Sequence, residues 1–467
     1  MRRETPADAV THDTYLSRSV CMSYVQINSS RGDQCLAPRA GAPRAGAPRI
    51  YSLIRFGLML AALLFFWPRS ATADIVDDFW KTTRSGVSEL RIFEDNDAFF
   101  PGSVSDKNYT NGTRLQFTFV GKAYVEDMDG NTYDLVDGGD GNAMIDLGGK
   151  PTRLVAGEKE GEVTARKGSL RFHAGKSGPS GGVQAQVSRT NMGFAVGQSI
   201  YTPSDTKTDK LLVDERPYAG WFYIGAFRET YTTHGAYYKS ELDIGCIGPC
   251  AMAEKTQAWI HRYIAHSGRA QGWQNQISDE LVVSLDGEYR QVFYEFPSGH
   301  EGEYRRFDLA YYVKGAVGNI FMDASGGIIL RMGWFHTYFS GQGAAPPAAT
   351  RAPSVEQLDS AIRRKWSLSR SLGRAREAES KEMYLFFRGE GRVVLYDAML
   401  QGGMMSANEI HTVAPSRFIA AGEVGAAIHY KYLLLQYSVG FKSSEHIMDD
   451  WSPTRHVYGR FQFALLF

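Results

Sequence analysis

The chain has 467 residues, and its 51 lysine and arginine residues balance its 51 aspartate and glutamate residues. This neutral balance gives no indication of a nucleic-acid partner, because such partners require a basic surface. Aromatic residues make up 13% of the chain, which also contains 49 glycines, and this composition is typical of β-rich proteins with many turns.

The amino-terminal region carries a targeting pattern. Two arginines flank the start of the apolar run FGLMLAALLFFW, and the small-residue tripeptide ATA follows it. The pattern predicts a signal peptide that is cleaved before Asp74. A short transmembrane anchor is the alternative, although this run of 12 residues is shorter than the roughly 20 that a spanning helix needs. We interpret residues 1–73 as an extension plus signal peptide, and residues 1–48 as the product of a start codon assigned too far upstream.

Residues 74–467 are expected to form one all-β domain. Apolar and polar residues alternate over lengths near the roughly 9–11 residues of a tilted membrane strand. The final run, VYGRFQFALLF, ends the chain on Phe467, as in outer-membrane barrels. The number of runs is even, as in bacterial barrels, and closure would satisfy every backbone group in lipid. We therefore predict a twelve-stranded antiparallel transmembrane β-barrel that the barrel-assembly machinery inserts into the bacterial outer membrane. The predicted strands are residues 88–95, 109–121, 190–200, 218–230, 233–247, 281–295, 302–315, 323–336, 383–396, 416–429, 430–443 and 457–467.

Three segments interrupt this alternation. Residues 122–189 and 337–382 are long and polar, which predicts exposed loops. Residues 251–266 follow Pro249 and carry Glu254 in their first turn, which predicts a short helix.

The mature chain contains two cysteines, Cys246 and Cys250, within the sequence GCIGPC. An exported protein meets an oxidising compartment, which permits a disulfide bond across this turn. A metal-binding pair is the weaker alternative, because no further cysteine or histidine stands at the spacing of a zinc site. The sequence does not decide between paired and free thiols.

Strand parity places polar side chains on the lumen side of the predicted barrel. Thr110 shares its parity with Arg114 and Gln116, whereas Leu115 and Phe117 alternate with them. Such residues are those of an ordinary polar lumen. More unusual is FEDNDAFF, residues 93–100, which follows an alternating run. Its acidic residues either solvate the end of the strand or form a site for a cation or a reacting water molecule.

The predicted helix carries two histidines. His261 shares a face with Gln257 and Ile264, whereas His266 lies on a more exposed side. A single histidine on a packed helix face is most often a structural residue. The helix alone therefore does not identify His261 as catalytic.

Seven stretches together resemble the outer-membrane lipid A 3'-O-deacylase family. They occur in order through residues 94–280, and the similarity is looser beyond them. The stretches are EDNDAF, DKNYTNGTRL, QSIYTPSD, DERPYAGWFYIG, ELDIGCIGPCA, the IHR of the helix, and GWQNQISDE.

The resemblance implies a twelve-stranded barrel with a calcium-dependent ester-cleaving site near the outer-leaflet end, between the wall and a short helix. His261 matches the catalytic histidine of the family, and Asn96, Asp97 and Thr110 match polar residues around it. Family members carry a glutamate between this histidine and the position of Trp273. The interval HSGRAQ lacks one here, so this chain departs from the family at one metal-binding or orienting position.

These roles agree with the chemistry of ester hydrolysis, which needs a base for water and positive charge near the oxyanion. A neutral imidazole suits the first task, and Ca²⁺ held by oxygen ligands such as Asp97 suits the second. Glu94 and Asp95 are expected only to solvate the strand end. No GxSxG motif supplies a serine nucleophile.

The substrate implied by the resemblance is lipid A, the membrane anchor of lipopolysaccharide. Lys207, Lys210 and Arg216 follow YTPSD and are expected to hold its phosphates. The predicted reaction is removal of the 3'-linked acyloxyacyl group of lipid A. Two alternatives stay open: a phospholipid hydrolase of the outer membrane, and a barrel for transport or structure without enzymatic activity.

Overall fold

The computed structural model describes most of the predicted barrel. The described residues are 87–96, 99, 108–127, 129, 131–137, 143–147, 149–153, 155–156, 162–165, 170–175, 184–185, 187–232, 235–265, 268–297, 305–335, 381–406, 409–430, 432–446 and 456–466. The predicted signal peptide lies outside these residues.

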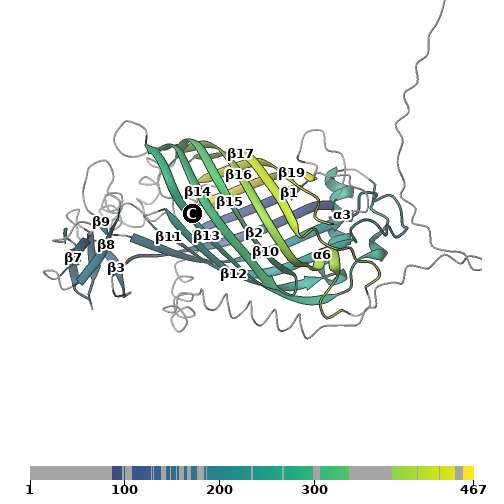
Figure 1. Cartoon of the computed structure of the whole chain (residues 1–467), viewed down its shortest axis with the longest axis horizontal. Coiled ribbons are helices and arrows are strands. Elements are labelled where there is room, and N and C mark those ends of the chain that lie inside the picture. Colours follow the sequence, from purple (N-terminus) through teal and green to yellow (C-terminus); the bar gives the residue numbers. More distant parts are fainter. Residues whose placement is uncertain are drawn as a thin grey trace, which may run out of the picture. The chain divides into compact units, whose positions relative to one another are not determined.

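Twelve strands form a closed antiparallel barrel (Figure 1). Closure follows from β1, which pairs with β19 on one side and with β2 on the other. The predicted fold and strand number are therefore confirmed. The barrel strands are β1 (Glu89–Asn96), β2 (Asn108–Glu126), β10 (Val187–Thr202), β11 (Ala219–Thr232), β12 (Ala236–Ile247), β13 (Glu280–Pro297), β14 (Arg305–Gly318), β15 (Phe321–Phe335), β16 (Lys381–Asp397), β17 (Phe418–Tyr430), β18 (Leu433–Lys442) and β19 (His456–Leu466).

Alternation along each strand separates an apolar outer face from a polar lumen. In β12, Glu241 and Asp243 are buried inside, whereas Leu242 and Ile244 are exposed on the outside. Exposed apolar residues on a barrel wall are expected where lipid replaces water. The period-two pattern in the sequence thus identified both the strands and their faces.

The two ends of the barrel differ. At one end of the barrel, Glu89 at the start of β1 pairs with Leu466 at the end of β19. At the other end, Asn96 of β1 pairs with Gly459. We call the second the α3 end, because the connection from β12 to β13 carries helix α3 there (Figure 1).

The short helical elements lie in connections at the α3 end. Among the described residues, no helix is long and apolar enough to cross a membrane. The elements are η3 (Pro249–Ala251), α3 (Ala253–Ile260), η4 (His261–Ala265), η5 (Trp273–Asn275) and α6 (Ala398–Gln401). The predicted helix over 251–266 is thus found, although it divides into a short α-helix and a following wider turn.

The polar stretch 122–189 contains more regular structure than the predicted loop. Strand β2 continues to Glu126, and β3 (Thr132–Asp137) pairs back onto it. Two further short strands extend this sheet beyond β3, and the next four form a separate small antiparallel sheet. Most of 337–382 lies outside the described residues. The short strands are β4 (Ala143–Asp146), β5 (Pro151–Arg153), β6 (Val155–Ala156), β7 (Glu162–Ala165), β8 (Leu170–Gly175) and β9 (Gln184–Ala185).

Candidate active site on the outer wall

Helix α3 lies against the outside of the barrel wall. A Cβ atom on Gly220 of β11 would approach the Cβ of Ala253 to 2.6 Å, so the helix touches the bare backbone of this strand. Tyr223 of the same strand lines the lumen, and Gly220 has the opposite parity. On β10, the Gln198 amide donates to the carbonyl oxygen of Ala251 at 2.6 Å and ties the helix start to the wall.

The chain after the helix packs back and fixes its position. Ile200 of β10, Tyr218, Ala253 and Trp273 belong to one buried cluster. The Trp273 indole N–H donates to Oε1 of Gln257 at 2.8 Å, so the helix is also held by a buried polar contact. The missing side chain at Gly220 therefore admits a helix whose inner face is held by both packing and hydrogen bonds.

His261 lies on the wall-facing side of this helix. Ala253, Gln257 and His261 follow one another at steps of four residues, and all three are buried. The opposite side is exposed, with Trp259 and Tyr263 carrying 55% and 60% of their maximal exposure. The catalytic candidate therefore points toward the barrel rather than into solvent.

The tautomer of His261 follows from its hydrogen bond. Its Nδ1 atom lies 2.6 Å from the carbonyl oxygen of Gly268. A carbonyl oxygen only accepts hydrogen bonds, so Nδ1 carries the proton and Nε2 is the basic nitrogen of the neutral ring. This is the arrangement that a general base requires.

Beside α3, the outer wall carries polar side chains where apolar ones are expected. Glu94 of β1 is paired in register with Thr113 of β2, and Asn96 with Asn111. The Thr113 hydroxyl donates to Glu94 at 2.6 Å, and the amide of Asn111 donates to the same carboxylate. On the other side, Glu94 pairs in register with Phe461, which is 46% exposed. We call Glu94, Asn96, Asn111 and Thr113 the outer polar row.

The outer polar row continues toward the helix. Asn111 is paired with Ile200 of β10, and Thr113 with Gln198. Both β10 residues contact the α3 region, through the buried cluster and through the hydrogen bond to Ala251. The row and the inner face of α3 therefore belong to one continuous part of the outer wall at the α3 end.

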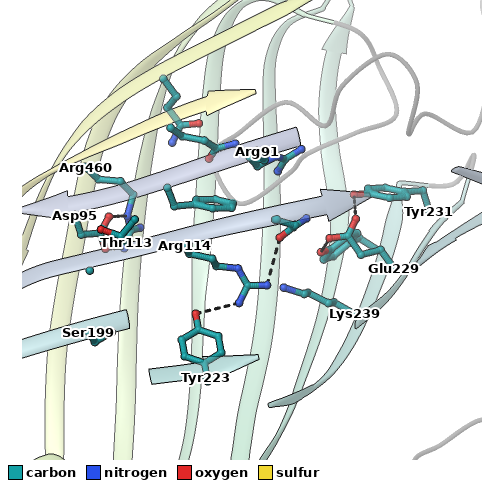
Figure 2. A pocket seen from close by; sticks show the side chains of 16 residues that line it. Arg91, Asp95, Thr113, Arg114, Ser199, Tyr223, Glu229, Tyr231, Lys239 and Arg460 are labelled. Carbon is teal, nitrogen blue, oxygen red and sulfur yellow. Dashed lines mark hydrogen bonds and ion pairs between the residues drawn. The ribbon is translucent and has the colours of Figure 1, made fainter. Parts of the chain in front are cut away.

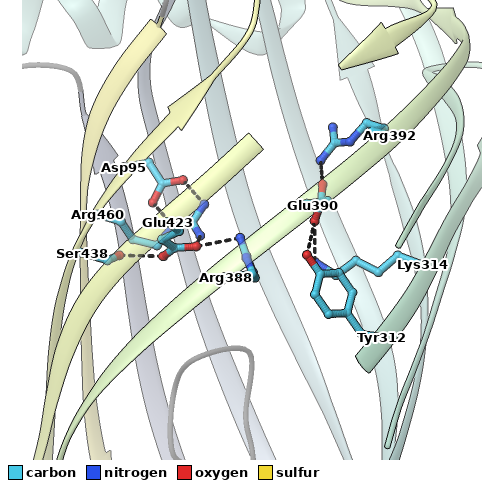
Figure 3. A network of polar contacts seen from close by, with 9 residues as sticks. All are labelled: Asp95, Tyr312, Lys314, Arg388, Glu390, Arg392, Glu423, Ser438 and Arg460. Atoms are coloured by element: carbon cyan, nitrogen blue, oxygen red, sulfur yellow. Dashed lines mark hydrogen bonds and ion pairs between the residues drawn. The ribbon is translucent and has the colours of Figure 1, made fainter. Parts of the chain in front are cut away.

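Asp95 belongs to the lumen, which corrects the expectation that it solvates the strand end. The Arg460 guanidinium forms two hydrogen bonds to its carboxylate, at 2.6 and 2.8 Å (Figure 3). Glu423 lies in the same network, 2.7 Å from Arg388. Glu94 also differs from the expectation, because it is half-buried and accepts hydrogen bonds from two side chains.

Charged pairs fill much of the lumen next to a cavity of about 270 Å³ (Figure 2). Arg114 donates to Glu241 at 2.6 Å and to the Tyr223 hydroxyl at 3.3 Å. Thr113 borders this cavity beside Gly112, although its hydroxyl group donates to Glu94 of the outer polar row. The predicted lumen position of Arg114 is confirmed, and Glu241 lies in the lumen beside it.

A β-bulge interrupts strand parity at Thr110. Ile200 is paired with Asn111, but the next residue, Tyr201, is paired with Tyr109, so Thr110 has no partner on β10. A bulge places one extra residue in a strand and changes the alternation beyond it. Simple alternation predicted that Thr110 faces the lumen, but the bulge removes the basis for this prediction. Its side chain, Asp97 and His266 lie outside the described part of the chain.

The three predicted phosphate-binding residues have different environments. Lys207 and Lys210 are exposed in the connection from β10 to β11. Arg216 is only 1% exposed, pairs with Glu445 at 3.1 Å, and lies over the Tyr201 ring. Its charge is thus turned inward and matched by a carboxylate, which differs from the accessible cation expected from the sequence.

The two cysteines of GCIGPC form a disulfide bond, with their Cα atoms 6.2 Å apart. It closes the turn between the end of β12 and η3. The alternative of a metal-binding pair is thereby removed, and the bond helps to fix the chain where it leaves the wall and enters α3.

Sequence reasoning missed Glu94, Asn111 and Thr113 as neighbours of the site. A signal was present: Asn111 and Thr113 share the parity of Leu115, whose side chain faces outward. Polar residues at lipid-facing positions lower the stability of a barrel, so their presence indicates a functional site or a segment that shields them from lipid. The sequence did not show which strand would lie beside the helix.

The closed barrel, its apolar outer face and its polar filled lumen define an outer-membrane β-barrel protein, here with a candidate site on the outside of the wall. Residues 58–467 match the family described as outer membrane protein LpxR, and the chain belongs to this family.

The chain is also similar to solved structures. LpxR from Salmonella typhimurium has 17% sequence identity and a TM-score of 0.51, covering 81% of this chain and 100% of that one. This similarity supports the barrel fold. The β domain of the Bordetella autotransporter BrkA is also similar, with 10% identity, a TM-score of 0.30, and coverage of 82% of this chain and 99% of that one. Comparison with curated protein sequences gives no match.

Proposed function

We propose that this protein is an outer-membrane hydrolase that removes the 3'-linked acyloxyacyl group of lipid A. The observation that carries the proposal is the place of His261. It is a buried histidine at the end of a helix that lies against β10 and β11 on the outer wall, and β10 pairs with β2, which carries part of the outer polar row. A lipid ester in the outer leaflet could reach this position from the membrane, without entering the lumen.

The proposed reaction is general base catalysis. Nε2 of His261 takes a proton from a water molecule, whose oxygen attacks the ester carbonyl carbon. The tetrahedral intermediate then breaks the carbon–oxygen bond to the sugar, and the imidazolium returns the proton to the leaving alkoxide. The products are a free acyloxyacyl acid and a sugar hydroxyl group. Gly268 keeps the ring in the required tautomer through Nδ1.

A calcium ion, when bound, would supply positive charge near the oxyanion. The outer polar row fits such an ion, because its side chains offer carboxylate, amide and hydroxyl oxygens, which hard cations prefer. Asp97 is a further proposed ligand for this ion, and Asn96 and Thr110 match polar residues around the histidine of the family. Lys207 and Lys210, both exposed at the α3 end, are proposed to contact the substrate phosphates.

The two alternative functions, a pore and a phospholipid hydrolase, are distinguished from a lipid A deacylase by different properties. A pore would use the lumen, but in the described residues arginines and carboxylates pair there, for example Arg331 with Asp308 and Arg388 with Glu423. A phospholipid hydrolase would use the same histidine on the same outer surface. The substrate therefore separates it from a lipid A deacylase.

The test is mass spectrometry of lipid A and of phospholipids from cells that express the protein. We expect lipid A to lose the 3'-linked acyloxyacyl group in wild-type cells and to keep it with His261→Ala. His266→Ala serves as the control and should leave conversion almost unchanged. If lipid A keeps all its chains while phospholipids are cleaved, the substrate is wrong. If neither changes, the enzymatic proposal is wrong.

A further inference from the structure

Glu94 differs from the lumenal carboxylates in its partners. Asp95 pairs with Arg460, and Glu241 pairs with Arg114. Glu94 instead accepts hydrogen bonds from the neutral side chains of Asn111 and Thr113. Within the described ranges, no lysine, arginine or histidine forms an ion pair with it. Among these described residues, the negative charge of Glu94 on the outer face of the wall thus has no cation paired with it.

This uncompensated charge is unfavourable beside lipid. A half-buried carboxylate loses part of its hydration, and this cost is normally offset by a cation. Burial favours the protonated form, whereas Asn111 and Thr113 both direct hydrogen atoms at the carboxylate and favour its ionised form without outweighing burial, so a bound cation would stabilise the ionised form further. The pocket is therefore suited to a positive group that these residues do not provide.

The surrounding atoms select the kind of cation. Asn111 is buried, its amide nitrogen is directed at Glu94, and its Oδ1 atom lies 3.3 Å from the Thr113 hydroxyl. Asn96 is paired in register with Asn111 and has the same strand parity as Glu94. The side chains thus offer one carboxylate with amide and hydroxyl oxygens, a set that suits a hard divalent ion such as Ca²⁺.

The position of Glu94 relates it to the helix. Glu94, Thr113 and Gln198 follow one another in register across β1, β2 and β10. Adjacent strands lie about 4.8 Å apart, so Glu94 is about two strand spacings from Gln198, which holds the start of α3. The interval 266–271 after His261 contains no carboxylate of its own.

We propose that Glu94, held by Asn111 and Thr113 on the outer wall, is a carboxylate ligand for a divalent cation beside α3, and supplies the negative charge that residues 266–271 lack. This inference deepens the proposed function and rests on it for the use of the cation in ester hydrolysis. The binding of the cation itself does not depend on that reaction.

The experiment measures cation binding to the purified, folded barrel in detergent micelles. Terbium luminescence, with displacement by Ca²⁺, gives the affinity without any substrate. Glu94→Gln keeps the size and the acceptor oxygen but removes the charge, and we expect Ca²⁺ affinity to fall at least about tenfold, since ligand charge sets affinity. Asp95→Asn is the matched control: the adjacent residue loses the same charge on the lumen face, and Ca²⁺ affinity should change less than about twofold.

Equal Ca²⁺ affinity in Glu94→Gln and wild type would overturn the proposal, and so would an equal loss in Asp95→Asn. Heat-modifiable migration in gels verifies that each variant is folded. Should Glu94→Gln fail to fold, Thr113→Val removes only one supporting hydroxyl, and an unchanged affinity there would also count against the site. If Glu94→Gln loses the cation while wild-type cells leave lipid A intact, the cation site stands and the proposed function fails.

Discussion

Gly220→Ala tests whether the contact between α3 and the outer wall positions His261, the proposed general base. The added Cβ would lie 2.6 Å from the Cβ of Ala253 and 3.1 Å from that of Ala251. Carbon atoms in contact are normally about 3.5–4.0 Å apart, so one side must move by about 1 Å. Strand β11 is hydrogen-bonded to β10 and β12 on its two sides, so we expect the helix to move.

The expected effect is large on activity and small on folding. A misplacement of about 1 Å can lower a rate about 100-fold, whereas overpacking of this kind costs about 1–3 kcal/mol of stability. The assay is the initial rate of lipid A deacylation by the purified protein, read by mass spectrometry, with heat-modifiable migration as the measure of folding. Gly389→Ala in β16 is the control, since an added Cβ meets nothing within 4 Å there. Full activity of Gly220→Ala, or an equal loss in Gly389→Ala, would refute the reasoning.

Three further outcomes are expected. His261→Ala should lower turnover by about 10²–10⁴-fold in a folded barrel, because general base catalysis is lost; near-normal turnover would remove His261 from the mechanism. Glu423→Leu should lower the free energy of unfolding by about 3–5 kcal/mol in a denaturant titration, since two arginines lose a buried partner. Burial raises the pKa of Glu445, but Lys442 and Arg216 outweigh it and hold that pKa well below its usual value. The ionised form thus stabilises the fold above about pH 4.3, and this contribution is lost as pH falls toward the depressed pKa. Thermal unfolding of wild type and Glu445→Gln between pH 2 and pH 7 should therefore converge at low pH; a constant difference would contradict this.

The sequence by itself determined the barrel. Side chains of a strand alternate between two faces, and lipid on one face requires apolar residues there. The period-two pattern therefore predicts the strands of the barrel directly. All twelve strands were placed within a few residues of their bounds, including the last one, which ends beside Phe467. The helix with His261 was also predicted, because its local sequence carries the start signal and the face.

Tertiary structure decided which residues meet, since alternation defines two faces but not which one is covered. FEDN is polar at every position after Phe93, so parity did not separate Glu94 on the outer face from Asp95, which is paired with Arg460 in a strand 365 residues further along the chain. The bulge at Thr110 depends on the register with β10, which local sequence does not fix. Likewise, the buried state of Arg216 follows from Glu445, a partner 229 residues away. The period-two pattern of side chains is a local property. Ion pairs and the packing of α3 against the wall depend instead on strands that come together only when the barrel closes.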